Sequence, residues 1–179
     1  MDTLTTAVDS EEIERSVRRY RRLWIARGDL LEASAAIDLI DRSGLRRSSH
    51  GEQPTELVIL TTALVVTSAR PFIDTRGNAQ LADRTLPGSI LRALTRPQRT
   101  LHDLVIHLRQ KEIAHSDAEV LELSFRVFPG GDSAISRTTR DPLYRRELKS
   151  LRSIIRKLDR EIEHQCETLR SKLPHHIWL

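Results

Sequence analysis

The sequence predicts a mainly α fold: an up-down bundle of four to five helices with one inserted β-hairpin. Three observations support this fold class. Aromatic residues make up 4% of the chain, glycine and proline number seven each, and apolar residues recur at three- and four-residue steps. With 179 residues the chain has the size of one domain with a substantial core, so residues 1–179 are expected to form a single helical domain.

The N-terminal part predicts two helices, or one helix with a kink. The first is expected from residue 5 to about residue 27, where one apolar stripe contains Ile13, Val17, Tyr20 and Trp24. Gly28 suits the C-terminal cap of this helix and Asp29 the N-cap of the next. A second inner face follows and ends at Ser43–Gly44. Its members are Leu30, Ala33, Ile37 and Ile40. Because the break is so short, the second helix could instead continue the first.

Five arginines surround the first apolar stripe: Arg15, Arg18, Arg19, Arg21 and Arg22. They are a secondary candidate for a contact with an RNA backbone. A solvated helix face paired with the nearby glutamates is the competing interpretation.

The next helix is expected from Pro54 to Ala69. Proline is well placed in a first helical turn, and Arg70–Pro71 should end the helix because proline disfavours the helical conformation in the residue before it. The run Leu57–Val66 is apolar nearly all round, so this helix is expected to be the most buried one, although the run is too short to span a bilayer. The connection from residue 72 to residue 97 is expected to be mostly irregular, with short helical turns.

A further helix is expected from Arg99 to Asp117, with the sequence RTLHDLVIHLRQKEIAHSD. Its predicted buried face consists of Leu101, Leu104, Val105 and Leu108. The helix carries Arg109 and His115, which lie roughly 120° apart around the axis and about 9 Å apart along it. Glu112 lies between them and could pair with either. A site that used both groups would need further walls, from a second helix or from a second copy of the chain.

After this helix the apolar period becomes alternating. Residues 120–139 predict a β-hairpin, because the turn Pro129–Asp132 separates two alternating segments. A two-stranded hairpin is marginal alone, so it should lean on the bundle, on a partner chain or partly over the groove beside the motif. A last helix is expected over residues 141–173, starting at Asp141–Pro142. Its apolar seam, suited to bundle or dimer packing, contains Leu148, Leu151, Ile155, Leu158 and Ile162.

The spacing from Arg109 to His115 fits R-x(4–6)-H and resembles the motif of the HEPN superfamily of small helical bundle proteins. The wider phrase is similar to an uncharacterised bacterial HEPN-like group with an LR-K-IAHSD phrase. Ser68–Phe72 and Leu86–Pro87 also resemble that group, so the resemblance covers roughly residues 57–117. It implies a metal-independent endoribonuclease of toxin or phage-defence type, in which two chains pair with their motifs facing each other.

Under this resemblance, Arg109 would bind or polarise the scissile phosphate, and His115 would transfer protons around the attacking 2′-hydroxyl. The candidates for substrate contacts are the neighbouring motif residues and two arginines of the preceding connection: Gln110, Lys111, Glu112, Ser116, Asp117, Arg70 and Arg76. The favoured interpretation of these two arginines is that they are solvated in the connection. Active members often have Asn, Asp or His directly after the motif arginine, where this chain has Gln110. Many HEPN domains are inactive, so the alternative function is a non-catalytic RNA-, nucleotide- or protein-binding dimerisation module.

Charge and cysteine content set broad expectations about partners and location. The formal net charge is +4, with 29 basic and 25 acidic residues interspersed, which fits an anionic partner such as RNA. One cysteine, Cys166, excludes an intrachain disulfide, and the N-terminus has no signal-peptide pattern, so a cytoplasmic location is expected. No zinc-ligand spacing or glycine-rich phosphate loop appears, so no metal and no cofactor are expected. The expected partners are a second copy of the chain, RNA and an antitoxin protein, with no membrane.

Overall fold

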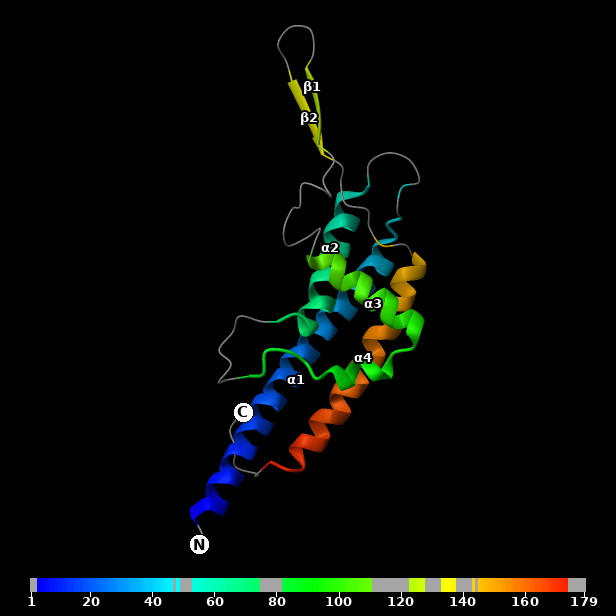
Figure 1. The fold of residues 1–179 in the computed structure, drawn as a ribbon. Helices are drawn as coiled ribbons and strands as arrows, with labels where there is room; N and C mark the ends of the chain where they lie inside the picture. Colours follow the sequence, from blue (N-terminus) through cyan, green and yellow to red (C-terminus); the bar gives the residue numbers. More distant parts are fainter. Residues whose placement is uncertain are drawn as a thin grey trace.

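The computed structural model describes residues 3–46, 48, 53–74, 82–110, 123–127, 133–137, 143 and 145–173. These residues form four α-helices: α1 (Thr3–Ser43), α2 (Thr55–Ala69), α3 (Arg96–Leu108) and α4 (Arg145–Arg170) (Figure 1). Two 3₁₀ turns lie between α2 and α3, namely η1 (Arg70–Phe72) and η2 (Gly88–Ala93). Two short strands follow α3, namely β1 (Leu123–Val127) and β2 (Ser133–Arg137). The expectation of a mainly α fold is confirmed.

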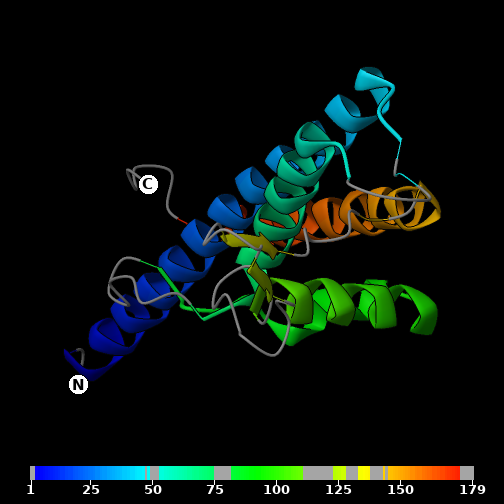
Figure 2. The same ribbon diagram turned by 90° about the horizontal axis from the view of Figure 1, so that it is seen from above.

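The helix α1 is the axis of the fold, and α2 and α4 pack along it (Figure 1). Ion pairs fix the direction of α4. Arg27 bonds Asp159 at 3.0 Å, and Arg152 bonds Asp38 at 2.9 Å. Since higher numbers on α1 meet lower numbers on α4, these two helices are antiparallel. Figure 2 shows α2, α3 and α4 on one side of α1, with no other described helix on the opposite side.

The helix α1 runs through Gly28 without a break, so the predicted helix boundary at Gly28–Asp29 is wrong and the continuous alternative is the one observed. Asp29 caps no helix. It is 6% exposed and bonds Arg70, so tertiary packing overrides the local stop signal. The end of α1 does lie where the sequence places it. Gly44 has a φ of +69°, a left-handed conformation that glycine adopts readily after a helix.

Gly28 has no packing role within the described part of the chain, because a Cβ added there would meet nothing within 4 Å. A glycine inside a helix costs about 0.8–1.0 kcal/mol relative to alanine. We therefore expect Gly28→Ala to raise the free energy of unfolding by about 0.5–1 kcal/mol, measured by urea denaturation at low protein concentration. Gly44→Ala is the matched contrast and should lower that free energy by about 1 kcal/mol, because of its positive φ. A loss of stability in Gly28→Ala would contradict this account.

The helix α2 packs against α1 and α3 but leaves one side open. Leu64 is fully buried, whereas Ile59 is 61% exposed. The hydroxyls of Thr67 and Ser68 on the buried side donate to carbonyls of their own helix, at 2.8 and 2.6 Å. By length and composition alone, the segment Thr55–Phe72 could cross a membrane. This segment is longer than the apolar run Leu57–Val66, which is too short to do so. The packing of α2 against two helices is that of a core helix in this fold.

The predicted face of α3 is buried in part. Val105 is buried, Leu101 and Leu108 are partly buried against the core, and the buried side is shifted toward His102. His102 and Val105 are buried, whereas Leu104 is 42% exposed. The reason lies in a ring contact: His102 packs edge-on against Phe72, with ring centroids 4.6 Å apart at 88°, which turns this side of α3 inward. The helix also begins at Arg96, three residues earlier than predicted, because Gln98 accepts a hydrogen bond from the Thr95 N–H at 3.1 Å.

The predicted apolar seam of α4 is buried within the chain. Its members are at most 6% exposed: Leu148, Leu151, Ile155, Leu158 and Ile162. The seam therefore packs this bundle and does not offer a surface to a second copy. The strands β1 and β2 pair antiparallel with Phe125 opposite Ile135, and they project from one end of the helical body (Figure 1).

Candidate functional site

Arg109 lies at the end of α3, where its N–H donates to the carbonyls of Ile106 and Val105. Its side chain is partly exposed. Because Arg109 follows Val105 by four residues and His102 by seven, it lies within about 40° of both around the helix axis. The guanidinium therefore leaves α3 on the side that His102 turns toward Phe72. This position gives a planar, always-charged donor at a partly open helix end, which suits contact with a phosphate.

Gln110 follows Arg109 in a wider, π-type helical turn and is exposed. The other predicted site residues lie outside the described residues: Lys111, Glu112, His115, Ser116, Asp117 and Arg76. Of the two predicted catalytic groups the structure thus describes Arg109, and its approach to His115 stays a prediction.

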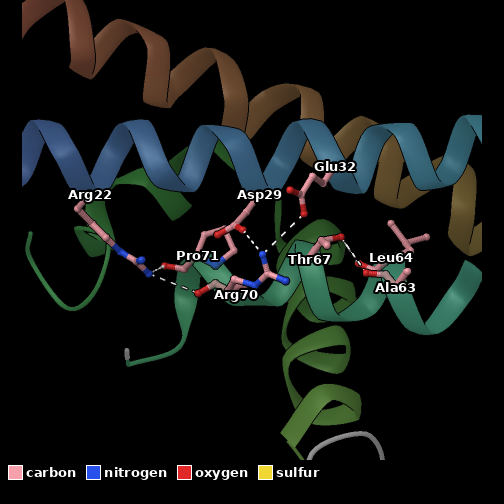
Figure 3. Close-up of polar contacts among 8 residues, drawn as sticks. All are labelled: Arg22, Asp29, Glu32, Ala63, Leu64, Thr67, Arg70 and Pro71. Atoms are coloured by element: carbon pink, nitrogen blue, oxygen red, sulfur yellow. Dashed lines mark hydrogen bonds and ion pairs between the residues drawn. The ribbon is translucent and has the colours of Figure 1, made fainter. Parts of the chain in front are cut away.

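Arg70, a predicted substrate contact, is engaged within the chain (Figure 3). Its Nη1 lies 2.6 Å from Oδ1 of Asp29 and 3.7 Å from Oε2 of Glu32. The Asp29 side chain is 6% exposed and that of Arg70 is 48% exposed. Arg70 therefore neutralises a buried carboxylate and ties the end of α2 to α1, while one side of it faces solvent.

Arg22 lies beside this ion pair and is 3% exposed. Its Nη2 donates to the carbonyls of Pro71 at 2.6 Å and Arg70 at 3.4 Å (Figure 3). Burial lowers the pKa of Arg22, and Asp29 and Asp74 partly oppose that shift. The guanidinium thus holds the turn η1 against α1.

This burial changes the interpretation of the arginine cluster on α1. Arg22 cannot contact an RNA backbone, and Arg19 donates from Nη2 to Gln165 on α4 at 3.1 Å. Two of the five clustered arginines therefore hold helices together. The prediction of an RNA contact by Arg22 is wrong, because the turn η1 covers this side chain. The helix α4 lies against the neighbouring Arg19.

The sequence carries no signal for the contact between His102 on α3 and the partly buried Phe72 in η1. His102 is 5% exposed, its Nδ1 lies 3.2 Å from Oδ1 of Asp103, and its Nε2 is buried without a hydrogen-bond partner. Burial lowers the pKa of His102 from its ordinary value of 6.5, and Asp103 partly opposes the shift while Arg99 adds to it. His102 is therefore neutral in the folded chain at neutral pH.

The lowered pKa of His102 predicts a loss of stability in mild acid. Below pH 6.5 the unfolded chain binds a proton at His102 that the folded chain does not, so the free energy of unfolding falls as pH drops from 7.5 toward the folded pKa. The loss is up to about 1.4 kcal/mol per pH unit within that window. His102→Phe should flatten this dependence in urea unfolding at several pH values. His107→Phe is the control, because His107 is exposed on the same helix, and its curve should follow that of the native chain. An unchanged curve for His102→Phe would contradict the prediction.

Within the described ranges no group of three or more His, Cys, Asp or Glu side chains could hold a metal ion. Comparison of the chain with family models, curated proteins and solved structures found no match. The residues that bear on function are therefore the chain's own: Arg109, partly exposed at the end of α3, and the following phrase that contains His115.

Proposed function

We propose that this chain is a HEPN-like, metal-independent endoribonuclease that acts as a cytoplasmic homodimer of toxin or phage-defence type, restrained by an antitoxin protein. The observation that carries the proposal is the position of Arg109. It lies partly exposed at the end of α3 and is the first residue of the run from Arg109 to His115 that resembles the HEPN motif. A mainly α fold and a net charge of +4 agree with such a function.

The proposed reaction is an internal transesterification of RNA. The 2′-oxygen attacks the adjacent phosphorus while His115 takes the 2′-hydroxyl proton. A P–O2′ bond forms and the P–O5′ bond breaks, giving a 2′,3′-cyclic phosphate. The departing 5′-oxygen takes a proton from water and becomes a hydroxyl. Arg109 binds the non-bridging oxygens with its planar fork and neutralises the charge that grows there, which is the task a metal ion performs in other nucleases.

The test is cleavage of a labelled single-stranded RNA in excess EDTA. We expect cleavage to persist and the products to carry 2′,3′-cyclic phosphate ends. Cleavage that stops in EDTA and returns with a divalent metal would overturn the proposal, as would 3′-hydroxyl products.

The second candidate function is a non-catalytic RNA-binding module. Gln110 favours it, because the HEPN motif often has Asn, Asp or His at this position, and so does the engagement of Arg70 by Asp29. It predicts RNA binding without turnover. The dissociation constant, measured by fluorescence anisotropy, should then rise steeply between about 50 and 200 mM salt.

A further inference from the structure

The turn η1 is attached to α1 through both its backbone and its first side chain (Figure 3). Arg22, which is 3% exposed, donates to the carbonyls of Pro71 at 2.6 Å and Arg70 at 3.4 Å. The Arg70 side chain returns to α1, where its Nη1 lies 2.6 Å from Oδ1 of Asp29. Because Arg22 and Asp29 are about 10 Å apart along α1, the two attachments leave η1 little freedom to tilt or slide.

Phe72 transmits this fixed position to α3. It is the last residue of η1 and is partly buried against the core. Its ring makes a T-shaped contact with that of His102, which is 5% exposed, with the ring centroids 4.6 Å apart and the planes at 88°. An aromatic pair prefers a defined orientation as well as a short distance. The contact therefore fixes how far α3 is turned about its own axis.

Two sides of α3 compete for burial. Leu104 lies about 160° from His102 around the axis, so the two side chains cannot both be fully buried. In the observed position Leu104 is 42% exposed, and His102 Nε2 is buried with no hydrogen-bond partner among the described residues. The exposed leucine and the unpaired nitrogen both favour turning α3 back, with Leu104 inward and His102 toward water. Phe72 opposes this turn because its ring packs against the buried side of His102.

The polar attachments of α3 to α4 lie at the far end of the helix from Arg109. Gln98 accepts a hydrogen bond from Lys157 at 2.9 Å and donates one to Ser153 at 3.3 Å. Arg109 lies about 16 Å further along the axis than Gln98, but about 10 Å from His102. The ring contact is therefore the closer constraint on the position of Arg109.

A small turn of α3 moves Arg109 by a distance that matters for chemistry. Side chains reach about 5–6 Å from a helix axis, so a turn of about 20° moves them by about 2 Å. Arg109 lies about 20° from His102 around the axis, so any turn that releases His102 also swings Arg109. A misplacement of about 1 Å at an active site can cost 10²-fold in rate.

We propose that Phe72 and His102 are positioning residues for Arg109: their ring contact holds α3 turned so that the guanidinium leaves the helix on the side of η1. In its effect on cleavage this inference rests on the proposed ribonuclease function. The turn of α3 itself does not, so it has a test that needs no RNA.

The first test is the distance between spin labels on the cysteines of a His107→Cys and Arg160→Cys double variant, measured by pulsed electron resonance. Both sites are exposed, one on α3 and one on α4, and the native Cys166 is buried. We expect Phe72→Ala to change this distance by about 2 Å or more, because α3 turns toward its Leu104 side. An unchanged distance and distribution width would overturn the proposal.

The second test is steady-state cleavage of a labelled RNA in EDTA. Phe72→Ala should lower kcat about 10- to 100-fold with a much smaller change in KM, because the displaced guanidinium loses contacts made in the transition state. His102→Phe keeps an aromatic pair at this position, so it should retain kcat within about threefold and also preserve the label distance.

Ile162→Ala is the matched control in both tests. Ile162 is fully buried on α4, beyond Lys157, whereas α3 runs the other way, since Leu104 and Arg146 line one hollow near the start of α4. This truncation leaves a cavity in the core without touching the ring contact, so it should lower stability but keep the label distance and kcat.

Equal losses of kcat in Phe72→Ala and Ile162→Ala would overturn the positioning role, because both losses would then follow from lower stability. A native chain that cleaves no RNA would instead end the proposed function. The label distance would then decide alone whether the ring contact sets the turn of α3.

Discussion

Replacing His115 with alanine is expected to lower the rate of RNA cleavage by roughly 10²- to 10⁴-fold, the usual contribution of a positioned acid–base group. The reason is that the 2′-hydroxyl must lose a proton as it attacks, and water is a weak base near neutral pH. Arg109→Ala should reduce cleavage comparably by removing the charge opposite the phosphate, whereas Arg109→Lys should keep part of the rate because it retains the charge without the fork. Single-turnover cleavage of a labelled RNA in EDTA measures all three variants.

His107→Ala is the matched control for this experiment. His107 is an exposed histidine on α3, just before Arg109 in the sequence, and lies outside the motif. It should keep the full cleavage rate. Full activity in the His115→Ala variant would remove His115 from the proposed reaction, and equal losses in both histidine variants would indicate damage to α3 instead of lost chemistry.

Leu64→Ala is expected to lower the free energy of unfolding by about 3 kcal/mol, within the range of roughly 2–5 kcal/mol for such core truncations. Leu64 is fully buried on α2, which packs against α1 and α3, so the alanine leaves a cavity in the core. Urea unfolding followed by circular dichroism measures the change. The urea concentration at the midpoint should fall, while the slope of the free energy of unfolding against urea concentration stays nearly constant.

Ile59→Ala on the same helix removes a branched side chain that is 61% exposed. It should change the stability by less than about 0.5 kcal/mol, because little apolar area is lost and alanine has the higher helix propensity. Similar losses in the Leu64 and Ile59 variants would contradict the packing of α2.

The helices that the sequence predicted well have local signals. For α2 the signals were a proline before the first turn and Arg70–Pro71 at the end, and the observed helix is Thr55–Ala69. For the end of α1 the signal was Gly44, whose positive φ closes the helix. In α4 the three–four spacing of apolar residues predicted five residues of the buried face, which also contains Ile154 and Cys166. Caps and periodicity act within a few residues, so one chain is enough to find them.

The features that the sequence predicted poorly depend on contacts between distant segments. The break at Gly28 did not form because Ala26 and Leu30 are both buried in one continuous face of α1. The α3 face was rotated because Phe72 packs on His102, thirty positions away. Spacing alone cannot reveal such a ring contact. A buried face that contains Leu101 and Leu104 fits the helical period as well as one that contains His102.

The buried charges of α1 left one signal that could have been used. Arg22 and Asp29 are seven residues apart with the buried Ala26 between them, so all three share one side of the helix. Opposite charges on an apolar side indicate an internal network. Burial raises the pKa of Asp29 and Arg70 opposes that rise, which agrees with a carboxylate held inside by arginine. The candidate site was less predictable. The motif identified Arg109, but the direction in which its side chain leaves α3 depends on which side of that helix is buried.

The helix α1 is buried unevenly along its length, which has a consequence for its local stability. Between residues 11 and 43 its buried side chains run from Tyr20 to Ile40, and residues 11–19 contribute none. A helical segment with few buried contacts opens more readily than one inside the core. Amide hydrogens of residues 11–16 should therefore exchange with deuterated solvent faster than those near Leu30.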